Sequence, residues 1–380
     1  MGSPKPITIR VVVAGGGTGG HLFPGIAIAQ EVMLRNPDNR VLFIGTDKSF
    51  ESEAVARAGF THRSVSAEGI KGRGLWRGLR AGVRIPVGLL QAMGILHGFK
   101  PDLVLGVGGY SSGPVVLGAW MLGIHTALHE QNLLPGITNR MLSYVADKIY
   151  VSFEETADRF GPEKSLLTGN PVRREFIDGL QGTDSSSSTG NGPFTVLVVG
   201  GSQGAHAINQ AVIDGLPLWK DRKQVRFIHQ TGPADEGPVR AAYEAAGVPG
   251  TVKPFFHDMA RLYRDADLVV CRAGATTVAE VTALGKGILF IPFPHAADDH
   301  QRLNASALAD QGAAEMILES DLTGALLAQR IQYYADQPDA LSAMGRNAAA
   351  FGKPDAAAVI VDDCYRQLIN TAPRETGGRP

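Results

Sequence analysis

The sequence predicts an α/β protein made of two Rossmann-like domains, each built on a parallel sheet. Short apolar runs of strand length recur with glycine close behind them, and helix-like stretches lie between them. A chain of 380 residues is too long for one ordinary core. A strand followed by a glycine-rich loop also occurs twice, at 13–20 and at 199–204. Because each domain has its own loop, we expect the ligand site in a cleft between the two domains.

The predicted elements alternate through both halves of the chain. The strand-like runs are 9–14, 41–44, 103–107, 196–199, 268–271 and 288–291, and the helix-like stretches include 25–34, 49–58 and 277–284. Such alternation requires right-handed crossovers between parallel strands.

The predicted boundary divides the chain into 1–172 and 173–354. The Ser/Gly-rich segment 182–193 has no apolar residue to bury, so it is interpreted as a flexible insertion. The segment 355–370 has helical periodicity, and its apolar face is predicted to pack back on the first domain.

Composition excludes several classes of protein. With 44% hydrophobic and 19% charged residues the chain resembles an ordinary globular protein, and its net charge of −1 argues against a globally basic nucleic-acid binder. Cys271 and Cys364 have no metal-ligand spacing, so neither a zinc site nor a disulfide framework is indicated, and a reducing cytoplasm is the default compartment. No apolar run reaches membrane-spanning length, so any membrane contact is expected to be peripheral.

The first glycine-rich loop, 15–21, reads Gly-Gly-Gly-Thr-Gly-Gly-His. It follows a strand and precedes a helix that is predicted to start near Pro24. Backbone N–H groups and a helix dipole at such a turn favour a phosphate or another anion. The alternative is a turn that only packs the helix against the strand. His21 closes the loop, where an imidazole can accept a proton from a sugar hydroxyl, or instead cap the helix or contact a phosphate.

The second loop, 200–205, contains Ser202 and is predicted to hold a diphosphate. Arg173 lies where the chain crosses to the second domain, and it suits the growing charge of a departing diphosphate. A surface ion pair of Arg173 with Glu175 is the alternative.

A third constellation covers 271–280, in which Thr276 or Thr277 is predicted to cap the helix that carries Glu280. A carboxylate there can accept hydrogen bonds from a ribose, although pairing with the helix dipole alone would also explain it. The residues His295, Asp298, Asp299 and His300 match no familiar ligand set, so no metal is expected.

Six motifs occur in order along nearly the whole chain, from near Val11 to near Leu368. They are Gly-Gly-Gly-Thr-Gly-Gly-His-Leu-Phe-Pro at 15–24, Gly-Val-Gly-Gly-Tyr at 106–110, His-Glu-Gln-Asn at 129–132, Gly-Asn-Pro-Val-Arg at 169–173, Gly-Gly-Ser-Gln-Gly at 200–204 and Asp-Asp-His-Gln at 298–301. Together they resemble the MurG family of peptidoglycan N-acetylglucosaminyltransferases. The resemblance implies a GT-B fold, no cofactor, no metal, and inverting transfer of N-acetylglucosamine from UDP-N-acetylglucosamine to the 4-hydroxyl of the muramyl sugar of lipid I, giving lipid II.

The resemblance also implies roles for single residues. The implied donor-binding residues are Thr18, Gly19, Gly20, Asn132, Arg173, Ser202, Phe256, Ala275, Thr276, Thr277, Val278, Ala279, Glu280 and Gln301. Among them Glu280 would hold the ribose, the backbone near Phe256 the uracil, and Gln301 the sugar. The implied acceptor-binding residues are Gly15, Gly16, Gly17, Gly108, Gly109 and Tyr110. The first domain would thus take the acceptor and the second the UDP-sugar. His21 is the first choice of catalytic base, with His129 and Glu130 in reserve.

A basic, apolar stretch follows Glu68, with no acidic residue until Asp102. The predicted membrane face consists of Arg73, Trp76, Arg77, Leu79, Arg80, Val83 and Arg84, which fall at helical spacing. An interfacial helix on anionic lipid needs this pattern, whereas a buried helix is the alternative. With a polyprenyl lipid as the implied acceptor, we expect a peripheral protein at the cytoplasmic face of the bacterial inner membrane. Other cell-wall synthesis proteins are candidate partners.

Three rival functions remain at this level. They are a GT-B transferase with another acceptor, a non-catalytic nucleotide-sugar-binding subunit, and a sugar-nucleotide epimerase. The motifs at 108–110 and 129–132 argue against the first, and His21 argues against the second.

Overall fold

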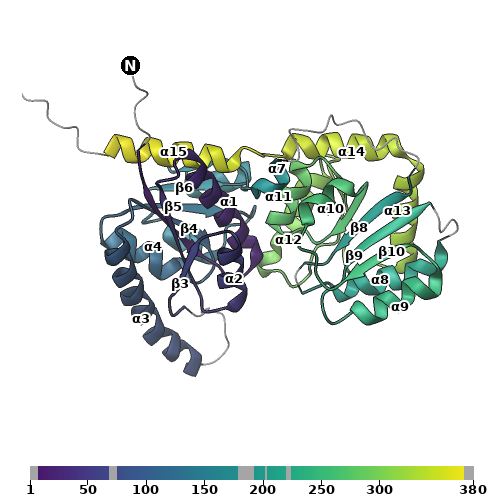
Figure 1. Cartoon of the computed structure of the whole chain (residues 1–380), viewed down its shortest axis with the longest axis horizontal. Helices are drawn as coiled ribbons and strands as arrows, with labels where there is room; N and C mark the ends of the chain where they lie inside the picture. Colours follow the sequence, from purple (N-terminus) through teal and green to yellow (C-terminus); the bar gives the residue numbers. More distant parts are fainter. Residues whose placement is uncertain (1–6, 68–74, 179–191, 202, 220–223, 372–380) are drawn as a thin grey trace, which may run out of the picture. The chain divides into compact units, whose positions relative to one another are not determined.

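The computed structural model describes residues 7–67, 75–178, 192–201, 203–219 and 224–371, in two compact units (Figure 1). Unit 1 comprises Met1–Arg173 together with Asp355–Pro380, and unit 2 comprises Arg174–Pro354. Each unit has its own parallel sheet, with helices on both faces of that sheet.

Unit 1 contains a seven-stranded sheet in the order β3-β2-β1-β4-β5-β6-β7, in which every pair is parallel. Its strands are β1 (Arg10–Gly15), β2 (Arg40–Gly45), β3 (Thr61–Ser64), β4 (Leu103–Gly108), β5 (His125–Glu130), β6 (Lys148–Val151) and β7 (Ser165–Leu167). The strand order reverses between β1 and β4. In open parallel sheets, such a switch point leaves a crevice at the carboxyl ends of the strands, where ligands bind.

The helices of unit 1 cover both faces of this sheet. They are α1 (Gly19–Arg35), α2 (Ser49–Arg57), α3 (Leu75–Phe99), α4 (Ser112–Met121), α5 (Ile137–Leu142), α6 (Glu154–Phe160) and the C-terminal α15 (Ala356–Thr371). Alternate residues of β1 serve the two faces, as the two-residue period of a strand requires. Val11 and Val13 pack with α1 and α15, whereas Val12 and Ala14 pack in the cluster that includes α3 and α4.

Helix α15 returns to unit 1 and lies beside α1 in Figure 1. Asn39 donates to the Tyr365 hydroxyl across 2.7 Å, and the Tyr150 hydroxyl donates to Asp363 Oδ2 across 3.1 Å. Ile360, Val361 and Cys364 complete the apolar contact.

Unit 2 repeats the design with six parallel strands in the order β10-β9-β8-β11-β12-β13. The strands are β8 (Phe194–Val199), β9 (Val225–Gln230), β10 (Gly250–Lys253), β11 (Leu268–Cys271), β12 (Gly287–Phe290) and β13 (Glu315–Met316). The α-helices are α7 (Arg174–Ile177), α8 (His206–Gly215), α9 (Glu236–Ala246), α10 (Met259–Asp265), α11 (Ala275–Ala283), α12 (His300–Ala309), α13 (Gly324–Asp336) and α14 (Pro338–Phe351), and the 3-10 turns are η1 (Leu216–Leu218) and η2 (Ala297–Asp299). Its switch point lies between β8 and β11.

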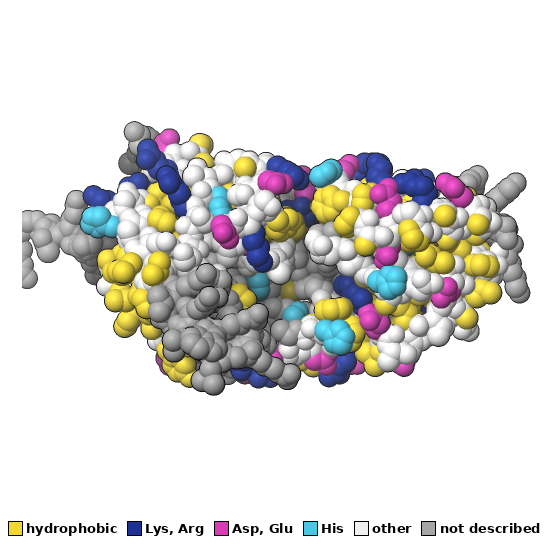
Figure 2. Space-filling model, turned by 90° about the horizontal axis from the view of Figure 1, so that it is seen from below, with side chains coloured by type: hydrophobic (Ala, Val, Ile, Leu, Met, Phe, Trp, Pro, Cys, Tyr) yellow, Lys and Arg dark blue, Asp and Glu magenta, His cyan; other side chains and the backbone are white. Residues whose placement is uncertain are grey.

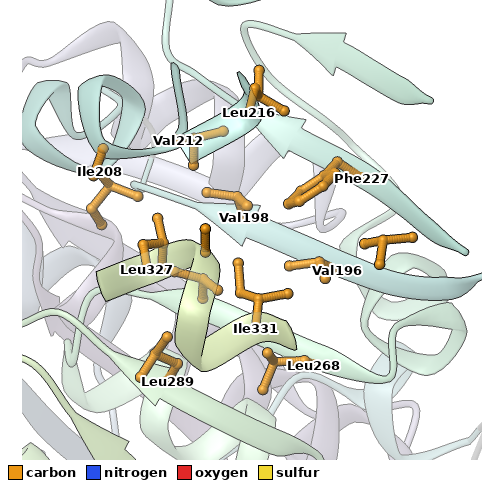
Figure 3. Packing of buried hydrophobic residues seen from close by; sticks show 14 of the residues in the cluster. Val196, Val198, Ile208, Val212, Leu216, Phe227, Leu268, Leu289, Leu327 and Ile331 are labelled. Carbon is orange, nitrogen blue, oxygen red and sulfur yellow. The ribbon is translucent and has the colours of Figure 1, made fainter. Parts of the chain in front are cut away.

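The unit 2 core fills the space between one sheet face and helices α8 and α13 (Figure 3). Val196 and Val198 of β8 face Ile208 of α8 and Ile331 of α13, and all four are essentially inaccessible to water. Each such side chain contributes about 1.5–3 kcal/mol by leaving water, so this core fixes the strand that carries the second glycine loop.

Two predicted helix starts are wrong. Helix α1 begins at Gly19, directly after the loop, because the Thr18 carbonyl already accepts from the amides of His21 and Leu22. Pro24 therefore lies inside the helix. Helix α11 begins at Ala275 with Gly274 as its N-cap, so Thr276 and Thr277 are first-turn residues and not caps.

Several predictions fall on residues that the structure does not describe. Arg73, Ser202 and most of the 182–193 segment lie outside the described residues. For the part of the membrane face from Trp76 to Arg84, the structure gives only the helical backbone of α3.

Candidate functional site

In unit 1 the first glycine-rich loop, 15–21, meets the glycine-containing segment 106–110 at the switch point of the sheet. The Gly16 amide contacts the Gly108 carbonyl at 3.4 Å, and Gly15 pairs with Gly108 where β1 and β4 end. A Cβ atom on Gly15 would overlap the Gly108 carbonyl oxygen, and one on Gly109 would overlap the Gly16 carbonyl oxygen. Gly17, Gly108 and Gly109 also have positive φ. Close backbone approach therefore explains the glycines, and the crevice edge is lined by main chain.

A buried carboxylate that the sequence did not reveal holds the first loop down. Glu51 on α2 has 0% exposure, and its Oε1 accepts from the Gly17 amide and the Thr46 hydroxyl, each at 2.6 Å. Its Oε2 accepts from the Thr46 amide at 2.8 Å and lies 4.0 Å from His62 Nε2. Burial lowers the pKa of His62, and the Glu51 charge raises it in part. Glu51 thus connects α2, the end of β2 and the glycine loop.

His21 lies in the first turn of α1 and is half-buried. Its Nδ1 is 3.1 Å from Gln131 Oε1. The ring stands against Gly108, because a Cβ atom there would lie 2.8 Å from Nδ1. The predicted base therefore lies at the carboxyl edge of the sheet, between the first glycine-rich loop and the segment 106–110.

The two reserve candidates, His129 and Glu130, form hydrogen bonds within the protein. His129 is fully buried in β5, and burial lowers its pKa to about 4, with the Gly169 carbonyl raising it and His21 lowering it further. Its Nε2 is 3.4 Å from the Gly169 carbonyl oxygen. Buried Glu130 accepts from the amides of Asn132 and Gly136 at 3.0 Å. Both side chains are turned into the protein, so the geometry favours His21 among the three.

Other predicted unit 1 residues gather at the same edge. Tyr110 is exposed, and Ser112, the first residue of α4, donates its hydroxyl to the Gly109 carbonyl at 2.8 Å. The Arg173 guanidinium lies over the Phe23 ring of α1 at 4.4 Å. Thr18 is the N-cap of that helix, and Gly19 and Gly20 are its first two residues. The N-termini of α1 and α4 therefore both begin at this edge, a favourable place for anions.

In unit 2, Gln230 at the end of β9 is a second residue that sequence reasoning missed. Its Nε2 donates to the Gly201 carbonyl at 3.0 Å, and its Oε1 accepts from the Phe256 amide at 3.0 Å. A Cβ atom on Gly204 would overlap the Thr231 carbonyl oxygen, so this loop also lies against backbone. One amide side chain thereby joins the second glycine loop to the segment at Phe256.

Helix α11 follows β11 and places Glu280 in its second turn. Glu280 is 5% exposed, and burial raises the pKa of the neighbouring Cys271 thiol, with the Glu280 charge raising it further. The side chains of Ala275, Thr276 and Val278 are buried, whereas Thr277 and Ala279 are half-buried. With three of these side chains buried, the backbone N–H groups of the first turn are what this helix start offers to an anion.

The last predicted segment leads into α12. Gln301 accepts from the Phe293 amide at 3.0 Å and so ties the loop after β12 to the helix. Asp298 and Asp299 both lie in the left-handed region, with φ of 53° and 56°. His295 is exposed. Within the described ranges, no group of three or more His, Cys, Asp or Glu side chains is arranged to hold a metal ion.

Comparison with known proteins agrees with this architecture. Residues 11–151 match the glycosyltransferase family 28 N-terminal domain, and residues 195–360 match the family 28 C-terminal domain. The sequence is 48% identical over 369 residues to the UDP-N-acetylglucosamine--N-acetylmuramyl-(pentapeptide) pyrophosphoryl-undecaprenol N-acetylglucosamine transferase of Trichlorobacter lovleyi, covering 93% of this chain and 97% of the relative. The enzyme of the same name from Geobacter sulfurreducens is 47% identical, with 93% and 98% covered.

Solved structures extend the comparison. The crystal structure of Acinetobacter baumannii MurG has a TM-score of 0.74 at 30% identity, covering 94% of this chain and 99% of that one. A Neisseria meningitidis UDP-GlcNAc 2-epimerase reaches a TM-score of 0.67 at only 13% identity, which shows a shared fold alone. The predicted GT-B fold, with two Rossmann-like domains on parallel sheets, is confirmed. This chain is a glycosyltransferase of family 28 and belongs to its MurG family of N-acetylglucosamine transferases.

Proposed function

We propose that this chain transfers N-acetylglucosamine from UDP-N-acetylglucosamine to the 4-hydroxyl of the muramyl sugar of lipid I, with inversion, giving lipid II. Relatives of 46–49% identity over at least 93% of this chain are named for this transfer. The observation that carries the proposal is the position of His21 at the unit 1 switch point, at the end of the first glycine loop and against Gly108.

In the proposed mechanism, His21 takes the proton of the acceptor hydroxyl as that oxygen attacks the anomeric carbon. The bond from the anomeric carbon to the diphosphate oxygen breaks, and UDP leaves from the opposite face with the electron pair. Arg173 and the backbone of the second glycine loop offset the negative charge that develops on the leaving group. This scheme assigns no step to a metal ion.

Unit 1 would hold the acceptor. Gly15–Gly17 and Gly108–Tyr110 would contact the acceptor diphosphate, because backbone amides and the N-termini of α1 and α4 favour an anion there. Thr18, Gly19, Gly20 and Asn132 would contact the donor from the same unit.

Unit 2 would hold the donor. Glu280 would accept from the ribose hydroxyls, the backbone at Phe256 would recognise the uracil, and Gln301 would contact the sugar. The Gln230 bridge between Gly201 and Phe256 supports this arrangement, since it fixes a diphosphate loop and a base-binding segment relative to each other. Ala275–Ala279 and Ser202, which is outside the described residues, would contact the phosphates.

We also propose peripheral attachment to the cytoplasmic face of the inner membrane. No helix in the described part of the chain is long and apolar enough to span a bilayer. Helix α4 is a neighbour of both α3 and α5, and Figure 2 shows hydrophobic side chains gathered on the unit 1 surface. The large apolar side chains that are exposed on these helices or just after them are Val87, Leu90, Trp120, Met121, Leu122, Ile137, Met141 and Tyr144, and we refer to this set as the apolar patch. Val87 and Leu90 lie on α3, the helix that also carries the predicted membrane face, which supports contact with anionic lipid.

Transfer of radiolabelled N-acetylglucosamine to a short-chain lipid I analogue tests the function directly. We expect the purified protein to form the lipid II analogue in the presence of EDTA, with no product when the acceptor is omitted. A folded protein that binds the donor but transfers nothing to the analogue would refute the acceptor. Conversion of UDP-N-acetylglucosamine without an acceptor would instead point to an epimerase.

A further inference from the structure

We propose that Gln131 is a positioning residue that fixes the tautomer of His21 and leaves Nε2 as the proton-accepting nitrogen. The catalytic meaning of this arrangement rests on the proposed function. The position of the proton on the His21 ring can be tested without any substrate. Neither the sequence motif nor the names of the relatives give Gln131 a role.

The orientation of the Gln131 amide is fixed by a backbone carbonyl. One end of the amide lies 2.7 Å from the Val107 carbonyl oxygen, which can only accept a hydrogen bond. That end must therefore be the NH2 group. The same nitrogen lies 3.1 Å from His129 Nδ1, so its two hydrogens have two acceptors. The amide oxygen consequently points the other way.

The next member of the network, His129, is consistent with this orientation. Its Nδ1 must accept from Gln131, so its proton is on Nε2, which lies 3.4 Å from the Gly169 carbonyl oxygen. The fully buried ring has a pKa lowered to about 4, so it is neutral near pH 7 and retains a lone pair to accept with. A charged His129 would have no lone pair for Gln131.

The consequence for His21 follows from the amide oxygen. Gln131 Oε1 lies 3.1 Å from His21 Nδ1, and an oxygen of this kind only accepts. Nδ1 must therefore carry the proton, because the other tautomer would set two lone pairs against each other. The lone pair of neutral His21 is then on Nε2. After proton transfer the Nδ1–H bond to Gln131 is kept, so one contact serves both states of the base.

The ring is also held in place sterically. Gly108 leaves the space that the His21 ring fills, and Val107, whose carbonyl orients Gln131, is its chain neighbour at the end of β4. Strand β4 thus both contacts the first glycine loop, through Gly108, and orients the Gln131 amide, through the Val107 carbonyl. Val107 and Gly108 belong to β4, and Gln131 directly follows β5 and is buried, so the contacts of the His21 ring come from the end of the sheet.

The tautomer is measurable by 15N NMR on histidine-labelled protein, with the His21 signals assigned from a His21→Asn sample. We expect the wild type to show a protonated Nδ1 and an unprotonated Nε2 at pH 8.5. Gln131→Met removes the acceptor at similar volume, and we expect His21 to lose this preference. A wild-type His21 with its proton on Nε2, or a spectrum that is unchanged in Gln131→Met, would overturn the proposal.

Kinetics separate positioning from a general structural effect. We expect Gln131→Met to lower kcat on the order of tenfold, the factor expected from one ordinary hydrogen bond, with the donor KM unchanged. Gln131→Glu keeps an acceptor for Nδ1 but sets its second oxygen against the Val107 carbonyl. We therefore expect it to recover the Nδ1–H tautomer at pH 8.5 while lowering thermal stability.

A matched control lies elsewhere in unit 1. Asn39 is a buried amide that accepts from the Ile9 amide at 2.8 Å and donates to the Val32 carbonyl at 2.7 Å. Asn39→Leu is expected to lower thermal stability as Gln131→Met does, with the His21 tautomer and kcat unchanged. An equal loss of kcat in Gln131→Met and Asn39→Leu would mean that Gln131 acts only through the stability of the fold. If the wild type transfers nothing, the proposed function fails, while the NMR result still decides the role of Gln131.

Discussion

Replacing Glu51 tests whether a buried carboxylate holds the first glycine loop in its working shape. Glu51 accepts three hydrogen bonds of 2.6–2.8 Å, from the Gly17 amide and from the amide and hydroxyl of Thr46. Hydrogen bonds to a charged group contribute about 1.5–3 kcal/mol each, and they do not add fully. We therefore expect Glu51→Ala to lower the free energy of unfolding by about 3–5 kcal/mol, a large part of the stability of an ordinary domain.

Glu51→Gln is the sharper variant because it keeps the shape. The new amide can still accept at one atom, but its NH2 group must face a backbone N–H. We expect a loss of about 1.5–3 kcal/mol in urea unfolding, with a raised acceptor KM because the Gly17 backbone shifts. Glu53→Gln is the control on the same helix, where the exposed pair with Arg57 contributes under about 1 kcal/mol. A Glu51→Gln protein with unchanged unfolding and unchanged KM would refute the reasoning.

Three further predictions concern other parts of the molecule. Gln230→Ala should raise the donor KM about tenfold with little change in kcat, because it frees the second glycine loop, and an unchanged donor KM in the transfer assay would contradict this. Burial lowers the pKa of His229 to about 3, against about 6.5 when unfolded, so the unfolded state binds the extra proton and stability should fall by about 1.4 kcal/mol per unit as pH drops below 6.5. In His229→Gln the urea midpoint should fall less between pH 7 and pH 5 than it does in the wild type. The same fall in both proteins would exclude His229 as the cause. Trp120→Ala with Tyr144→Ala should lower sedimentation with phosphatidylglycerol vesicles at least about tenfold, whereas Tyr333→Ala in unit 2 should not, and equal binding of all three proteins would remove the apolar patch from the membrane contact.

The fold could be predicted from local patterns, and the site could be predicted only in part. Apolar runs located strands β1, β2, β4, β8, β11 and β12 within about two residues, because both faces of a parallel strand are buried. The start of α1 was wrong because proline is a weak boundary signal once the preceding loop already bonds as a helix turn.

The missed residues share one physical property. Glu51 meets Gly17 across 34 positions of sequence, and Gln131 meets His21 across 110. No periodicity or local spacing encodes such contacts, since they depend on which strands become neighbours in the sheet. His21 could be singled out because its chemistry is visible in a local motif. The groups that orient it are visible only in the fold.

The most direct measurement of the central claim is the transfer rate of His21→Ala beside wild type, with donor binding followed by calorimetry. General-base catalysis contributes about 10²–10⁴-fold, so we predict a loss of kcat of that size with donor affinity retained. His97→Ala, an exposed histidine at the far end of α3, should behave as wild type. A His21→Ala enzyme that transfers within about threefold of the wild-type rate would contradict His21 as the base on which this account depends.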